Sequence, residues 1–187
     1  MHRILLLVSA IPCAIVIAMT WWFGTRVLWA QGKRMCRADV GKWLPDPNED
    51  KKLQSSEATA KVFGVQVRNK ALKHWKKQSP KLAKAREGNR AIGMIAPPFG
   101  GIIGIFLVVT AKPILGLAIF VMATAISAIM GILSLPSELT AIRRYIKSDE
   151  FKGSFPNSYD EESVIACALA QVWESGLPPI LRWLQPK

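Results

Sequence analysis

Residues 91–137 read AIGMIAPPFGGIIGIFLVVTAKPILGLAIFVMATAISAIMGILSLPS and are the most informative part of the sequence for the fold. Its only charged residue is Lys112, which divides it into two uncharged runs, residues 91–111 and 113–137. Each run is close to the ~20 residues that a helix needs to cross a hydrocarbon core of ~30 Å. Backbone groups cannot stay unpaired in lipid, so each run should be helical. The sequence therefore predicts a transmembrane hairpin with a tight turn at Lys112.

A third uncharged run, residues 4–23, lies near the N-terminus. The alternative to a membrane anchor is a cleaved signal peptide, whose apolar part usually has about 7–15 residues. This run is longer and ends in bulky Trp21 and Trp22, which suit the aromatic belt at a membrane surface. We therefore expect an uncleaved helix, and an all-α polytopic membrane protein with three transmembrane helices.

Charge predicts how these helices are oriented. The segment from Gln31 to Arg90 has 16 Lys or Arg against 6 Asp or Glu, a net +10 of the chain's +12. Excess Lys and Arg in a loop of this length marks the cytoplasmic side. We expect a multi-pass protein of the cell (inner) membrane, with the N-terminus outside and the basic loop and C-terminus in the cytoplasm.

Four parts follow from this layout. Residues 1–30 form the N-terminal anchor, 31–90 a basic cytoplasmic helical segment, 91–137 the hairpin, and 138–187 a cytoplasmic or interfacial helical tail. Apolar residues near helical spacing predict an amphipathic helix before the hairpin, over residues 55–78, and another after it, from residue 158 to about 176.

The helix over residues 55–78 is rich in basic side chains, so anionic lipid headgroups are a candidate ligand. A solvated helix that packs on the rest of the protein is the simpler interpretation. Nucleic acid is not expected, because stacking aromatics are few and the segment is tethered to a membrane. The expected partners are membrane lipids, with another membrane protein or a second copy of the chain as the alternative. The candidate lipid-facing residues are Arg68, Lys70, Lys73, Lys76 and Lys77.

The hairpin also carries small residues at the spacing used by packed membrane helices. Gly100 and Gly104 form a GxxxG pattern, and the second run has Ala123, Ser127 and Gly131 at the same spacing. Membrane helices associate through close packing of such residues. The sequence predicts that these residues form the contact between the two helices, with an oligomer interface as the alternative.

The segment SLPSELTAIRR, residues 134–144, spans the end of the hairpin and continues beyond it. With a helix before the hairpin and an Ala-rich closing segment, SVIACALAQVWESGLPPILRWL, it resembles the YugP-type bacterial membrane zinc metallopeptidases. That family has HExGHAxQ in the cytoplasmic helix and LPVEFNASRRA after the hairpin. The resemblance loosely covers residues 55–184, and its most specific part is LP-x-E-x-x-A-x-R-R. The matching residues are Leu135, Pro136, Glu138, Ala141, Arg143 and Arg144.

The resemblance implies a zinc site that this chain has lost. Glu138 matches the third ligand and His74 the second histidine, but Lys70 stands in place of the first histidine and Ala71 in place of the general base. Catalytic zinc needs three protein ligands and a water, and a protonated ammonium offers no lone pair. We therefore expect no catalytic residues, no enzyme activity and no cofactor. Zinc is the cofactor that the resemblance would otherwise suggest.

Two simpler interpretations of these residues stay open. Glu138 can help to start a cytoplasmic helix with Ser137 as its cap, and can pair with Lys70, Lys73 or an arginine. His74, alone in a basic helix, can be an ordinary polar residue. No phosphate-binding loop, G-x-S-x-G motif or metal-type spacing of Cys or His occurs in the sequence.

The sequence is compatible with three functions. The first is a non-catalytic membrane protein on a metallopeptidase-like scaffold, which acts by binding or scaffolding. The second is an active metallopeptidase or other hydrolase whose site is not recognisable from the sequence. The third is a scaffold that binds anionic lipids through its basic loop.

Overall fold

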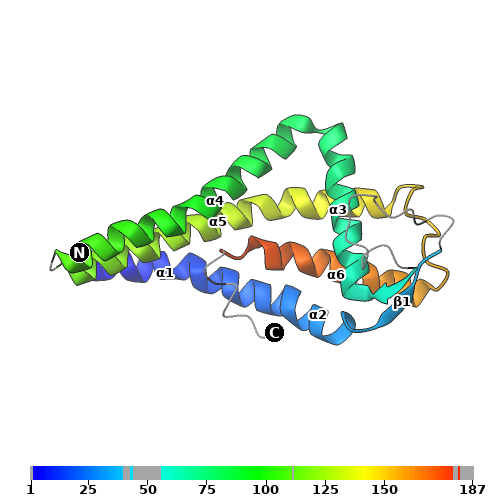
Figure 1. The fold of residues 1–187 in the computed structure, drawn as a ribbon, viewed down its shortest axis with the longest axis horizontal. Helices are drawn as coiled ribbons and strands as arrows, with labels where there is room; N and C mark the ends of the chain where they lie inside the picture. Colours follow the sequence, from blue (N-terminus) through cyan, green and yellow to red (C-terminus); the bar gives the residue numbers. More distant parts are fainter. Residues whose placement is uncertain (1, 40–42, 44–55, 111, 179–180, 182–187) are drawn as a thin grey trace.

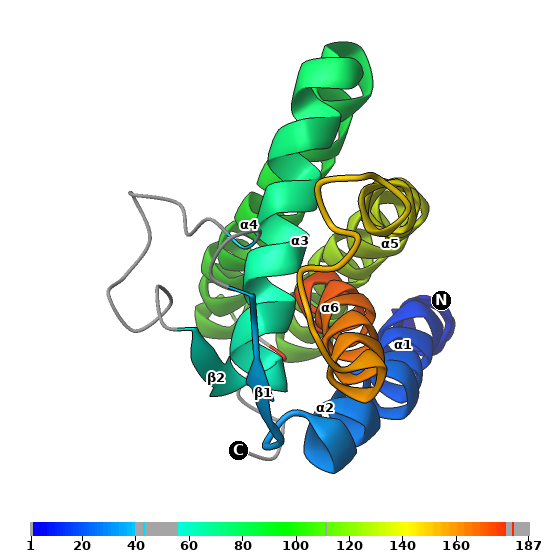
Figure 2. The ribbon, with the colours of Figure 1, turned by 90° about the vertical axis from the view of Figure 1, so that its right-hand side faces the viewer.

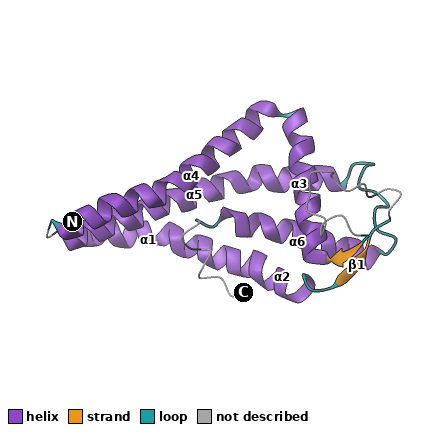
Figure 3. Ribbon diagram, viewed as in Figure 1, coloured by secondary structure: helices purple, strands orange, loops and turns teal. Residues whose placement is uncertain are grey.

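The computed structural model describes residues 2–39, 43, 56–110, 112–178 and 181. Nearly all of the regular structure is helical, which confirms the predicted all-α class (Figures 1 and 3). One short antiparallel pair of strands, β1 and β2, was not predicted. The elements are α1 His2–Met19, the π-helix η1 Thr20–Thr25, α2 Arg26–Gln31, β1 Met35–Arg37, β2 Glu57–Thr59, α3 Ala60–Gln78, α4 Pro80–Val109, α5 Pro113–Ile146 and α6 Ser158–Gly176.

Three helical segments are long and apolar enough to cross a membrane, as a multi-pass membrane protein requires: Leu6–Gln31, Pro80–Val109 and Pro113–Ile146. Many of their large apolar side chains point away from the protein. Ile102 and Phe106 on α4, for example, are 68% and 66% exposed. Such a surface is costly in water and suits a helix surrounded by lipid.

Small residues bring α4 and α5 together, as the sequence predicts. A Cβ built on Gly100 would overlap the side chain of Ala123, and one built on Gly104 would lie 2.9 Å from the carbonyl oxygen of Gly116. The Ser127 hydroxyl donates to the carbonyl of Gly93. The GxxxG pattern of α4 therefore forms a contact within the hairpin.

The sequence predicts that Gly131 lies in the contact between the two hairpin helices, but it does not. It faces α6 instead of α4, and a Cβ added there would overlap the carbonyl oxygen of Gly176. The last turn of α6 thus lies close against α5. Leu177, just beyond it, packs with Val16 of α1 and Ala128 of α5. The C-terminal end of α6 is therefore inserted between two of the apolar helices.

The helix α5 continues past the end of the apolar run. It runs through Pro136 and Glu138 to Ile146 without a break. The Ser137 hydroxyl donates to the carbonyl of Ser134, one turn back. The expectation that Ser137 caps a new helix beginning at Glu138 is wrong, because a change from apolar to charged side chains does not by itself break the backbone hydrogen bonds of a helix.

The helix α3 lies across the other helices at the end opposite the hairpin turn. Figure 1 shows it roughly perpendicular to α5 and in front of α5 and α6, and Figure 2 shows it standing beside these two helices. It begins at Ala60 because residues 57–59 pair with β1, so the predicted start at residue 55 is wrong; residue 55 itself lies outside the described residues. Pro80, at the first position of α4, turns the chain after Gln78, and proline is favoured at this position.

Between α3 and α5 the core is apolar and aromatic. Phe63 packs edge-to-face against Trp43 and Phe155, with ring centroids 5.9 and 5.4 Å away. The helix α6 also packs against η1, and the Thr20 hydroxyl of η1 donates to the Trp173 carbonyl of α6 at 3.4 Å. The elements α3, α5, α6 and η1 therefore form one packed body at this end of the molecule.

Candidate functional site

The candidate site is built around Glu138, the residue that the sequence comparison with the metallopeptidase pattern singles out. This carboxylate has a relative exposure of 0%. It lies on α5, just after the uncharged run 113–137, while Arg90 on α4 lies just before the run 91–111. Because α4 and α5 form a hairpin, both residues lie at the same end of the apolar region. This is the end crossed by α3.

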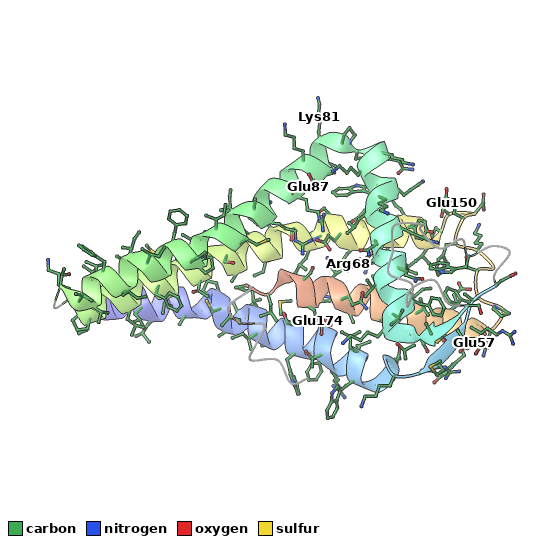
Figure 4. All side chains as sticks on the ribbon, in the orientation of Figure 1. Glu57, Arg68, Lys81, Glu87, Glu150 and Glu174 are labelled. Carbon is green, nitrogen blue, oxygen red and sulfur yellow. The ribbon has the colours of Figure 1, made fainter. Side chains whose placement is uncertain are left out.

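Arginines from two other helices bind the carboxylate. From α3, Arg68 donates two hydrogen bonds to Oε2 of Glu138, from Nη2 at 2.8 Å and from Nε at 3.2 Å. From α4, Nε of Arg86 donates to Oε1 at 2.7 Å. Figure 4 shows Arg68 beside α5. We call Arg68, Arg86, Arg90 and Glu138 the arginine cluster.

The cluster holds more positive than negative charge. Nη2 of Arg86 also lies 2.6 Å from Oε1, but its geometry gives no hydrogen bond, so it adds attraction only. Arg90 is the outermost member, with Nη1 3.9 Å from Oε1 and its side chain 36% exposed. Three guanidinium groups therefore surround one carboxylate. Such a site attracts anions and repels a divalent cation.

The fold explains why these side chains meet. Figure 1 shows α4 and α5 lying side by side near the hairpin turn and separating toward α3, which joins α4 at Pro80. The three helices form the sides of a triangle. Arg86 and Arg90 are four residues apart and so share one face of α4. Ion pairs from α3 and α4 to α5 then hold the triangle together.

His74 lies apart from the arginine cluster. Its ring centroid is 6.2 Å from that of Tyr145, and its Nε2 is 3.5 Å from Nε2 of Gln78. Of the described contacts of His74, none reaches Glu138. Among the residues that the structure describes, no group of three His, Cys, Asp or Glu could hold a metal ion. The two residues that match zinc ligands are therefore not brought together.

Lys70 and Ala71, the other two residues that the sequence comparison singled out on α3, are packed against the protein. Nζ of Lys70 lies 3.7 Å from the centroid of the Trp43 ring, a cation–π contact. Ala71 is buried in the core beside it. Ala71 has no titratable group, so it cannot act as the general base whose position the resemblance gives it, and the Lys70 ammonium is engaged with the Trp43 ring instead of standing as a ligand.

The five basic residues predicted to face lipid have different environments. Arg68 points inward, with its side chain 16% exposed. Lys76 forms a 2.8 Å ion pair with the exposed Glu87 of α4. Of the five, Lys73, Lys76 and Lys77 are exposed, whereas Lys70 is half-buried over Trp43.

Two cavities adjoin the arginine cluster and share Arg90 and Ser175. One, of about 270 Å³, opens between α3, α4 and α6. The other, of about 240 Å³, extends between α4, α5 and α6. The first is lined by Lys61, Val65, Arg68, Arg90, Gln171, Glu174 and Ser175, and the second by Asn89, Arg90, Gly93, Met94, Ser127, Gly131, Ser134, Ser175, Gly176 and Leu177.

The two buried cysteines outside the membrane helices are not reactive nucleophiles. Burial raises the pKa of the Cys167 thiol to about 11, with the nearby Cys36 adding to the shift. Burial also raises the pKa of Cys36, and the Asp160 carboxylate acts in the same direction. A reactive cysteine needs a thiolate near neutral pH. Both thiols belong to the apolar core.

The sequence singles out Glu138 and predicts that it pairs with a lysine or an arginine; three arginines surround it, and two of them, Arg68 and Arg86, donate hydrogen bonds to it. It did not single out Arg86 and Arg90. Their spacing of four residues just before an uncharged run was a usable signal, because it places two charges on one helix face at a membrane boundary. Comparisons with protein-family models, curated proteins and solved structures found no match to this chain.

Proposed function

We propose that this chain is a non-catalytic membrane protein on a scaffold like that of the YugP-type metallopeptidases, and that it acts by binding. The observation that carries the proposal is the pairing of Glu138 with Arg68 and Arg86. The carboxylate that would have to coordinate a metal already accepts hydrogen bonds at both oxygens. The arginines take the place of a metal as its positive partner.

The chemistry of the neighbouring residues supports the same conclusion. Activation of water by zinc needs a coordinated ion and a general base close to it. Here the candidate histidine contacts Tyr145, and the positions of the first ligand and the base hold Lys70 and Ala71. A ring of guanidinium groups would also raise the energy of a bound Zn²⁺.

We also infer an orientation from charge. The basic α3 and the loop before it lie on the cytoplasmic side, and the N-terminus and the turn at Lys112 lie outside. The excess of Lys and Arg between Gln31 and Arg90 supports this orientation.

A hydrolysis assay tests the lack of catalysis. The purified full chain is incubated with a mixed peptide library in the presence of zinc, with and without a chelator. We expect cleavage at the background level in both samples. Cleavage that a chelator abolishes, and that Glu138→Gln also abolishes, would sink the proposal.

A second candidate is a surface scaffold for anionic lipids. It is favoured by the exposed Lys73, Lys76 and Lys77 and by the course of α3 across the ends of the membrane helices. Each such lysine close to an anionic surface contributes about 1 kcal/mol. This binding should disappear in ~1 M salt, where charges are screened within about 3 Å. Lipid binding that persists in high salt would argue against a scaffold held to the membrane only by these surface lysines.

A further inference from the structure

We propose that the two cavities that meet at Arg90 bind one anionic phospholipid, with its phosphate group between Lys61 and Arg90. This proposal names a ligand for the binding role above and rests on it. The shared chemistry is a phosphate group, and a hydrocarbon chain attached to it distinguishes a lipid from a soluble phosphate.

The charge of the outer cavity favours an anion. Lys61, Arg68 and Arg90 line it, and Glu174 is the only acidic residue among the lining residues. Within the arginine cluster, Glu138 is already shared by three guanidinium groups. The lining side chains of the outer cavity therefore carry three positive charges against one negative charge. A phosphate group would be attracted to this excess and would accept bidentate hydrogen bonds from arginine.

The level of the cavity matches that of a lipid headgroup. Arg90 is the last charged residue before the uncharged run 91–111, which is long enough to span the hydrocarbon core. A side chain at this point lies at the polar boundary of a bilayer. Basic pockets between membrane helices at that boundary are suited to the headgroups of anionic lipids.

The inner cavity continues from the phosphate position toward the apolar region. Past Arg90 its lining includes Gly93 and Met94 on α4, one turn deeper, and Leu177 after α6. Leu177 also packs against Val16 and Ala128, within the apolar spans. Beyond Arg90 the lining is uncharged, mainly glycine and serine, with Met94 and Leu177 as its larger apolar side chains. The two adjoining cavities thus change from a charged to an uncharged lining toward the membrane helices.

The side-chain oxygen of Gln171, which lines the outer cavity, has no hydrogen-bond donor among the described residues. The Gln171 side chain, 5% exposed, donates to the carbonyl of Lys61 at 2.7 Å. Its Oε1 is buried and accepts no hydrogen bond from the described residues. A headgroup that carries a hydroxyl, such as that of phosphatidylglycerol, offers both the phosphate and the donor.

Native mass spectrometry of the full chain in a non-ionic detergent tests the site. Dioleoyl phosphatidylglycerol, dioleoyl phosphatidylcholine and glycerol 3-phosphate are titrated separately. We expect one tightly bound phosphatidylglycerol per chain that persists at high salt, with the other two ligands bound at least about tenfold more weakly, since charge-assisted contacts and chain burial both contribute. Equal binding of phosphatidylcholine, or of glycerol 3-phosphate, would overturn the assignment to an anionic lipid.

Variants locate the site. Arg90→Gln should weaken phosphatidylglycerol binding about tenfold or more, and Lys61→Gln, on a different helix, should weaken it in the same direction. Lys81→Gln is the matched control, because Lys81 is exposed on α4 and points away from the cavities (Figure 4). If Arg90→Gln does not fold, the lipid binding of Lys61→Gln alone tests the location of the site. Unchanged binding in Lys61→Gln, or an equal loss in Lys81→Gln, would place the lipid elsewhere.

The same sample separates the two proposals. Chains that contain zinc and cleave peptides would refute the non-catalytic role whatever lipid they bind. Metal-free, inactive chains that do not distinguish between the two lipids would refute the lipid site and leave the non-catalytic role standing.

Discussion

At the scale of single residues, Glu138 is explained by its partners. A fully buried carboxylate is tolerated only when it is paired and hydrogen-bonded. Arg68 and Arg86 provide both, and their own side chains are only 16% and 10% exposed. The three groups depend on one another, because removal of the carboxylate would leave two buried guanidinium groups without an anion.

The substitution Glu138→Gln should therefore lower the free energy of unfolding by about 3 kcal/mol or more, the usual result of breaking a buried ion pair on one side. Thermal unfolding of the full chain in detergent measures the change. The control is Glu87→Gln, which removes an exposed carboxylate paired with Lys76. An exposed pair contributes about 0–1 kcal/mol, so the control should be nearly neutral. Equal effects of the two substitutions would contradict the structural role of Glu138.

At the scale of elements, apolar runs locate helices better than they locate helix ends. The uncharged runs 91–111 and 113–137 predict two helices, and both exist. However, α4 begins eleven residues earlier, at Pro80, and α5 ends nine residues later, at Ile146. Charged residues can continue a helix in water, so its end depends on the backbone and its contacts. The strand pairing of β1 and β2 depends on residues about twenty positions apart, which local patterns do not reveal.

The contact between α5 and α6 depends on Gly131. A side chain at this position would meet the backbone of Gly176, which cannot move away without shifting α6. We expect Gly131→Ala to lower the free energy of unfolding by about 1–3 kcal/mol, as overpacking does.

The matched control is Gly88→Ala on α4, where an added Cβ meets nothing within 4 Å. Alanine favours a helix over glycine by up to about 1 kcal/mol, so this variant should be unchanged or slightly more stable. Thermal unfolding in detergent compares the two variants. A neutral Gly131→Ala would show that α6 does not lie this close to α5.

At the scale of the whole molecule, the hairpin turn and α3 lie at opposite ends of the apolar helices (Figure 1). A water-soluble maleimide should therefore label the two ends from different sides of the membrane. In a Cys13→Ser background, Lys112→Cys should react in intact cells. Lys152→Cys, in the loop between α5 and α6, should react only after permeabilisation. The opposite pattern would reverse the proposed orientation.

The whole arrangement also shows what the sequence could predict of the site. The LP-x-E-x-x-A-x-R-R pattern drew attention to Glu138, and the basic residues elsewhere in the sequence suggested an ion pair for it. Its particular partners could not be predicted, because Arg68, Arg86 and Glu138 come from three helices. Only the triangle of α3, α4 and α5 brings them within hydrogen-bond distance.

The most direct test of this account is the zinc content of the chain. The full chain is purified from cells grown with added zinc, and the metal is measured by mass spectrometry beside the Glu138→Gln variant. Because arginines already hold both oxygens of Glu138, we predict that both proteins contain zinc far below one ion per chain. About one zinc ion per chain in the unmodified protein, lost in Glu138→Gln, would contradict the account.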